Sequence, residues 1–300
     1  MLKDNVYGSW QVLAGFGLAS MLTLAQAATP AMPGTLNYIE GQVSINGQSA
    51  TSKDIGAAQL MLNQVLETGQ GKAEVLLTPG VFLRLSNGGL LRMVSPGLSD
   101  TRVELLRGEA LVEVTELFKE NHIRVLEGTS STTLLKKGLY QFNAANLSVS
   151  VFDGKAQVSD GDQTVTLKKN RGVRIGQPQL KSVKFEQVDG YGLYAWSKLR
   201  SQYAGQASLQ RAQTIALNGD WYGAGWYWDP YSSMYSYLPR NGILYSPFGW
   251  GFYSPWPAFH GPLGHGSVGL GFGHGLRGAL GGHGGFGGHG GGHGGGHGGH

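Results

Sequence analysis

The chain has 300 residues, a formal net charge of +4 and no cysteine, which excludes disulfide bonds, thiolate catalysis and cysteine-ligated metal sites. The charge is small for this length, and residues 221–300 carry only Asp229, Arg240 and Arg277 as charged side chains. Because phosphate backbones are bound by clustered Lys and Arg, a nucleic-acid-binding surface is not expected.

The N-terminus has the pattern of a secretory signal peptide. Lys3 precedes the apolar run "VLAGFGLASMLTLA", which ends in the small-x-small sequence Ala25-Gln26-Ala27. An uncleaved anchor is the alternative, but the run is shorter than the roughly 20 apolar residues that a spanning helix needs. We therefore expect residues 1–27 to be removed, no further transmembrane helix, and a periplasmic, secreted or envelope-associated mature protein.

Residues 36–176 are predicted to be mainly β. Apolar residues alternate at period two, for example at Val75 and Leu77 and at Val149 and Val151, between closely spaced turn signals. The turn signals are Asn46-Gly47, Pro79-Gly80, Asn87-Gly88, Asp153-Gly154, Asp160-Gly161 and Lys169-Asn170. This pattern indicates either a short β-solenoid or a sandwich of short antiparallel strands, and it does not choose between them.

Residues 189–217 are predicted to be helical. Asp189 stands at an N-cap position, and the segment ends at Asn218-Gly219. An interruption is expected near Gly205. A stripe of large apolar side chains at near-helical spacing is expected to pack against the β domain; it comprises Trp196, Leu199 and Tyr203.

Residues 221–259 are unusually aromatic. Of the residues from Trp226 to Trp256, twelve are Trp, Tyr or Phe, and interspersed Gly and Pro exclude a long helix. We expect hairpins that form a compact subdomain docked on the helix through Trp196 and Tyr203. An exposed remainder is expected to contact glycan or an envelope protein; it comprises Trp250, Tyr253 and Trp256.

Residues 260–300 form a Gly/His-rich tail that is predicted to be disordered. Glycine spacers could let several imidazoles reach one Zn²⁺, Ni²⁺ or Cu²⁺ ion, but ordering the chain would keep the affinity weak. The candidate metal ligands are His283, His289, His293, His297 and His300. The alternative is a solubilising or glycan-contacting tail, and no other cofactor is expected.

The β region offers no catalytic constellation. His122 is its only histidine and is expected on the surface, because no G-x-S-x-G sequence accompanies it. Glu104 and Glu113 are expected on solvated strand faces. We therefore expect a non-enzymatic protein.

A basic run closes the β region. It is predicted to be a solvated edge that deters strand addition, with contact to anionic envelope polymers as the alternative. The run comprises Lys168, Lys169, Arg171 and Arg174.

In their order, the β motifs resemble the FecR domain, the extracytoplasmic module of ferric-citrate-type regulators in Gram-negative bacteria. The motifs are "EGQVSING" at 40–47, "LMLNQVLETGQGKAEVLLTPGVFLRLSNGGLL" at 60–91, "LLRGEALVEV" at 105–114 and "VTLKKNRGVRI" at 165–175. The family's regulators carry a helical anti-sigma region before their membrane span, whereas only eleven residues precede the apolar run here.

The resemblance therefore implies a FecR-like binding or sensing module without the anti-sigma region. A structural or adhesive envelope protein that contacts glycan through its aromatic segment is one alternative to this reading. A metal-handling protein that acts through the His-rich tail is the other.

Deletion of residues 260–300 is expected to abolish Ni²⁺ or Zn²⁺ binding and to leave the thermal stability of the β domain unchanged, because no core contact is lost. Binding by the intact chain should weaken below about pH 6.5, where imidazole is protonated. Titration calorimetry measures both effects. An intact chain that binds metal no better than a Gly/Ser peptide would exclude the metal site.

Overall fold

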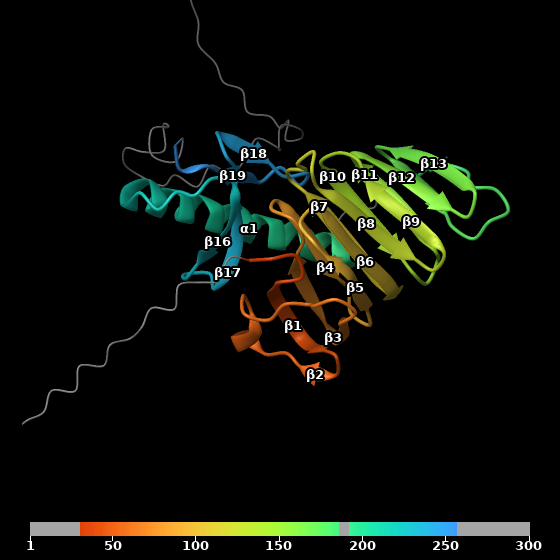
Figure 1. Ribbon diagram of the computed structural model, residues 1–300, viewed down its shortest axis with the longest axis horizontal. Helices are drawn as coiled ribbons and strands as arrows, with labels where there is room; N and C mark the ends of the chain where they lie inside the picture. The colour runs from red at the N-terminus through yellow and green to blue at the C-terminus, as the bar shows by residue number, and fades with distance from the viewer. Residues whose placement is uncertain (1–30, 186–191, 257–300) are drawn as a thin grey trace, which may run out of the picture. The chain divides into compact units, whose positions relative to one another are not determined.

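The computed structural model describes residues 31–185 and 192–256 (Figure 1). The chain divides into two units, Met1–Gly264 and His265–His300, and all described residues belong to the first. The predicted signal peptide, the N-cap at Asp189 and the Gly/His tail lie outside the described residues. No helix within the described ranges is long and apolar enough to cross a membrane.

The described chain is mainly β with one long helix, as the sequence predicts. The strands of the β domain are β1 (Leu36–Ile45), β2 (Gln48–Ser49), β3 (Val65–Leu76), β4 (Val81–Leu85), β5 (Leu90–Pro96), β6 (Asp100–Arg107), β7 (Glu109–Val114), β8 (His122–Glu127), β9 (Ser130–Leu134), β10 (Gly138–Asn143), β11 (Ser148–Asp153), β12 (Lys155–Asp160), β13 (Gln163–Lys168), β14 (Arg171–Arg174) and β15 (Val183–Lys184). A short 3₁₀ helix, Ser52–Asp54, follows β2. Each predicted turn pair lies at or between strand ends.

These strands form one continuous sheet that folds over into two layers. The long strand β3 belongs to both layers, because residues 73–76 pair with β4 while residues 65–67 pair with β5. From β3 one layer continues through β4, β7, β10, β11, β14 and β15, and the other through β5, β6, β8, β9, β12 and β13. We call them the helix-side layer and the outer layer.

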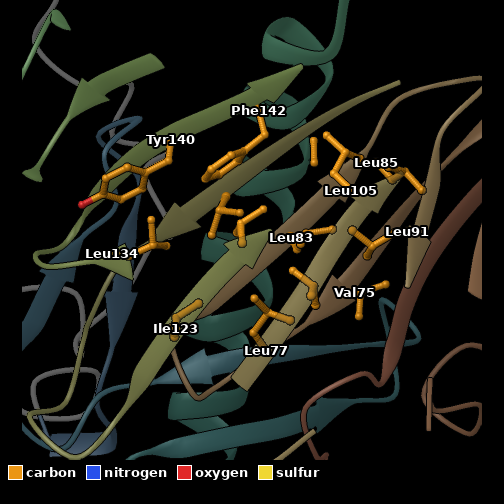
Figure 2. Packing of buried hydrophobic residues seen from close by; sticks show 14 of the residues in the cluster. Val75, Leu77, Leu83, Leu85, Leu91, Leu105, Ile123, Leu134, Tyr140 and Phe142 are labelled. Atoms are coloured by element: carbon orange, nitrogen blue, oxygen red, sulfur yellow. The ribbon is translucent and has the colours of Figure 1, made fainter. Parts of the chain in front are cut away.

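The main hydrophobic core lies between the two layers. In Figure 2, Leu83 and Phe142 of the helix-side layer meet Leu105 and Ile123 of the outer layer, and all four are fully or almost fully buried. The ladders are antiparallel except that β6 pairs in parallel with β8, because β7 between them in sequence crosses to the other layer. Of the two predicted alternatives, a short solenoid and a sandwich, the structure is thus the sandwich. One connection, from β6 through β7 to β8, crosses between the layers.

The helix-side layer is buried on its second face as well. Phe82 and Leu111 alternate with core residues along their strands and are fully buried on the side away from the core. Helix α1 (Gly192–Asn218) covers this face. The interruption predicted near Gly205 is wrong, because the helix is continuous.

The buried stripe of α1 is also not the one predicted. Tyr203 is 46% exposed and Leu199 is exposed too, while Trp196 is half-buried and donates its indole N–H to Glu40 at 2.8 Å. The helix approaches neighbouring backbone closely, so most side chains of its inner face are small or polar, with a larger apolar residue near each end. The buried residues of the helix are Leu193, Ser197, Arg200, Ser201, Ala204, Gly205, Ala207, Ser208, Ala212 and Ile215.

The aromatic segment folds into two hairpins, as predicted. They are formed by β16 (Gly225–Asp229) with β17 (Met234–Leu238) and by β18 (Ile243–Tyr245) with β19 (Gly251–Tyr253). Phe82 of the helix-side layer contacts both hairpins: its ring centroid lies 4.9 Å from that of Trp226 and 5.8 Å from that of Phe252. Most of the aromatic density is therefore a second core between the sheet and the hairpins. The predicted docking through Tyr203 is wrong.

A charged network is buried beneath α1. Arg84 lies between two carboxylates: its Nε donates to Glu74 Oε2 at 2.7 Å and its Nη1 donates to Glu113 Oε2 at 2.5 Å. All three side chains are fully buried. The prediction that Glu113 lies on a solvated face is wrong, because the helix covers that face of the strand.

The helix completes this network. Arg200 donates to Glu74 at 3.0 Å, and the hydroxyl of Ser201 donates to Glu113 at 2.6 Å. Burial alone would raise the pKa of Glu74, but the cations of Arg200 and Arg84 lower it to about 2. The network therefore holds two carboxylates and two guanidinium groups, whose formal charges cancel.

Arg84→Met should lower the free energy of unfolding by about 3–5 kcal/mol, because it leaves Glu113 buried without a cation. Arg92→Met is the matched control: it breaks the ion pair of Arg92 with Glu104, which is partly exposed, and should cost less than about 1 kcal/mol. Urea unfolding measures both. Equal costs would mean that the buried network does not hold the helix to the sheet.

Candidate functional site

The hairpin of β18 and β19 presents an uncharged face to solvent. Phe252 points inward and is fully buried, while Tyr253 is half-buried and packs against the cluster of Ala212, Ile215, Tyr227 and Leu238. Ile243 lies opposite Tyr253, and Tyr245 lies opposite Gly251. Tyr245 is 60% exposed, Ile243 is exposed and Tyr253 is half-buried. We call Ile243, Tyr245 and Tyr253 the aromatic platform.

The glycine in this hairpin makes room for a tyrosine ring. A Cβ added to Gly251 would lie 2.8 Å from the hydroxyl oxygen of Tyr253, so the Tyr253 ring occupies the space above that glycine. Burial raises the pKa of Tyr253, and the neighbouring Tyr245 hydroxyl raises it further. The absence of a side chain at position 251 thus leaves room for the Tyr253 ring over the glycine that pairs with Tyr245.

Hydrogen bonds fix the platform to the helix and to the first hairpin. The backbone N–H of Tyr253 donates to Ser208 Oγ at 2.9 Å, and that hydroxyl donates to the Tyr237 carbonyl at 2.9 Å. Within the β18–β19 turn, the backbone N–H of Ser246 donates to the Trp250 carbonyl at 2.8 Å. The backbone under the platform is therefore held before any ligand arrives.

The aromatic residues predicted to contact a partner have different surroundings. Tyr253 belongs to the platform, and Trp256 is 72% exposed. Trp250 is half-buried, and its indole N–H is buried without a hydrogen bond to any described residue. Tyr245 and Ile243 were missed, although the period-two spacing of "ILY" and "GFY" marks the outward face of a hairpin.

The predicted metal ligands His283, His289, His293, His297 and His300 lie outside the described residues. Within the described ranges, no three His, Asp or Glu side chains are grouped so that they could hold a metal ion. His122 is exposed, as expected, and its Nδ1 lies 3.1 Å from the Ser99 carbonyl oxygen. The adjacent Asp100 forms ion pairs with Arg102 and Arg124.

One acidic side chain has an unusual environment. Glu127 ends β8 on the same face as Ile123 and Val125, so its carboxyl group points between the layers and is almost fully buried. Neither carboxyl oxygen has a regular hydrogen-bond partner among the described residues. Burial raises the pKa of Glu127 to about 8, against a smaller opposing effect of the Asn143 backbone.

Comparisons with known proteins do not assign a family. No family model and no curated protein matches the chain. Two crystal structures of a proposed anti-sigma factor from Parabacteroides distasonis are similar, each at 16% identity, with TM-scores of 0.36 and 0.35. The matches cover 46% and 50% of this chain, and 64% and 70% of the other. The chain thus spans less than two thirds of the first, and the FecR resemblance stays a prediction.

Glu127→Gln should make stability less sensitive to pH. Because the folded-state pKa of about 8 lies above the ordinary 4.5, the stability contributed by the protonated carboxyl is complete below about pH 4.5 and is lost as the pH rises through 8. At pH 8.5 the variant should therefore be more stable than the parent, on the order of 2–4 kcal/mol.

At pH 4 the two proteins should be nearly equal. Urea unfolding across this range tests the prediction, with Glu120→Gln as the control because Glu120 is exposed. A variant that is no more stable than the parent at pH 8.5 would show that Glu127 is not buried as a neutral acid.

Proposed function

We propose that the chain is a non-enzymatic, FecR-like binding module of the bacterial cell envelope. It acts in the periplasm or outside the cell, and it contacts an envelope ligand through the aromatic platform. The observation that carries this proposal is the exposed Tyr245 ring on a hairpin whose backbone is already fixed by Ser208 and by the second core.

The chemistry of the platform favours a neutral glycan. A phenol ring offers an apolar face on which the C–H groups of a sugar can pack, and a hydroxyl tip that can hydrogen-bond to water or to a sugar hydroxyl. The two charged residues of this segment are not on the platform. Asp229 is buried and accepts a hydrogen bond from the backbone of Ser232, while Arg240 precedes β18.

Prior ordering of the backbone supports binding. A surface that is ordered only when the ligand arrives loses affinity to conformational entropy. Here Phe252 is inserted against Phe82, and Tyr253 is joined to the helix through Ser208. The Tyr253 ring is already packed, so the exposed Tyr245 side chain is the main group left to be ordered, and it has few rotatable bonds.

Two competing functions follow from other parts of the sequence. In a structural or adhesive protein the β domain would be a spacer and the aromatic segment would retain envelope polymer. In a metal-handling protein the His-rich tail would carry the function by binding the metal ion. All three proposals include the predicted signal peptide and therefore a location outside the cytoplasm.

Tyr245→Ala should reduce retention on polysaccharide from cell-envelope extract about tenfold, which corresponds to roughly 1.4 kcal/mol of binding free energy. Tyr231→Ala is the matched control, because Tyr231 is at least as exposed but lies in the β16–β17 turn. Sedimentation with protease-treated and untreated extract measures retention and separates a glycan from a protein ligand. Equal retention of parent and Tyr245→Ala on both materials would exclude the platform as the binding surface.

A further inference from the structure

One end of the β domain carries a cluster of cations. It is built from the turns that join β9 to β10, β11 to β12 and β13 to β14, together with β15. Its members are Lys136, Lys137, Lys155, Lys168, Lys169, Arg171 and Lys184. We call this set the basic end. Its members come from four separate places in the sequence, at 136–137, 155, 168–171 and 184.

A buried tyrosine holds the turns of the basic end together. The hydroxyl of Tyr140 donates to the Lys136 carbonyl at 2.5 Å and accepts the backbone N–H of Lys155 at 3.2 Å. The backbone N–H of Leu135 donates to the Lys155 carbonyl at 2.9 Å. Lys169 reaches the neighbouring turn, where its ammonium group lies 3.5 Å from Asp153. The clustering is therefore fixed by the backbone.

The cations of the basic end face one another directly. Lys155 lies opposite Lys168 in the β12–β13 ladder, and Arg171 lies opposite Lys184 in the β14–β15 ladder. Like charges at directly opposed positions destabilise a sheet. Asp153 is the one acidic side chain that forms an ion pair with the basic end among the described residues. The arrangement works against folding in the free protein, and an anionic partner would relieve it.

Exposed leucines accompany the cations at this end. Leu135 is 40% exposed in the same turn as Lys136, and Leu98 is exposed in the turn before β6. In the β6–β8 ladder Asp100 pairs with His122, and the β8–β9 ladder brings the start of β8 next to the end of β9, which Leu135 follows. Leu98 and Leu135 therefore lie at the same end of the outer layer. The turns at this end of the outer layer thus expose leucine side chains next to the lysines of the basic end.

We propose that the basic end binds the surface of a membrane that contains anionic phospholipid. The lysine and arginine side chains contact lipid phosphates, and each cation near such a surface contributes about 1 kcal/mol. Leu135 and Leu98 enter the interface between headgroups and acyl chains. A soluble polyanion would use the cations alone, whereas the exposed leucines are accounted for by lipid.

Vesicle sedimentation tests the proposal with the full chain. We expect binding to phosphatidylcholine vesicles that contain phosphatidylglycerol, weaker binding to phosphatidylcholine alone, and loss of the difference at high salt. The double variant Lys136→Glu with Lys168→Glu should bind the anionic vesicles at least about thirtyfold more weakly, because two contributions of about 1 kcal/mol are lost. Lys53→Glu with Lys198→Glu is the matched control, since both residues are exposed elsewhere.

Leu135→Ser separates a lipid surface from a soluble polyanion. It should weaken binding to anionic vesicles and leave binding to heparin unchanged. Binding to heparin without binding to vesicles would overturn the proposal in favour of a soluble polyanion. Equal vesicle binding by the two charge-reversal variants would overturn it in favour of a solvated face. Urea unfolding of each variant confirms that it is folded, and Tyr245→Ala should bind vesicles normally because the platform is a separate surface.

Discussion

The attachment of α1 to the sheet depends on the buried charged network that Arg200 and Ser201 of the helix complete. Without Arg200, the network beneath the helix would hold Glu74, Glu113 and one guanidinium group, and would carry a negative charge in a buried place. Docking of α1 supplies the missing cation and the Ser201 hydroxyl together. A helix displaced by one turn would bring Trp196 or Ala204 to the place of Arg200 and leave Glu74 short of a partner. The network therefore specifies the register of the helix as well as its attachment.

The local features of this fold could be read from the sequence, because they depend on neighbouring residues. Pairs such as Asn46-Gly47 adopt positive φ at both residues, and period-two apolar residues form the core between the layers. Glu113 could not be placed in this way. Its alternation with Val112 and Val114 is that of a half-solvated strand, and only a helix from a distant part of the chain makes its face an interior.

The helix and the candidate site also depend on contacts between distant parts of the chain, which local sequence patterns do not predict. Large side chains at helical spacing normally mark a buried stripe, but Tyr203 points to solvent because Gly205 must approach the Gly251 carbonyl. A Cβ on Gly205 would lie 2.9 Å from that oxygen. The aromatic segment was expected to form hairpins with an exposed remainder, and Tyr253 was among the residues named. Tyr245 was missed because the pairing of its strand with Gly251–Tyr253, which places it opposite Gly251, was not predicted.

Burial of both faces of the helix-side layer restricts where this protein can change. A substitution at Phe82 or Arg84 disturbs a core whichever way its side chain points, so those strands have little freedom to acquire new contacts. The turns at the strand ends and the outward side of the β18–β19 hairpin do not have this constraint. Related chains could therefore diverge in what they recognise at these places while keeping the interior unaltered. Variation among them should be greatest in the turn residues and least along the layer beneath the helix.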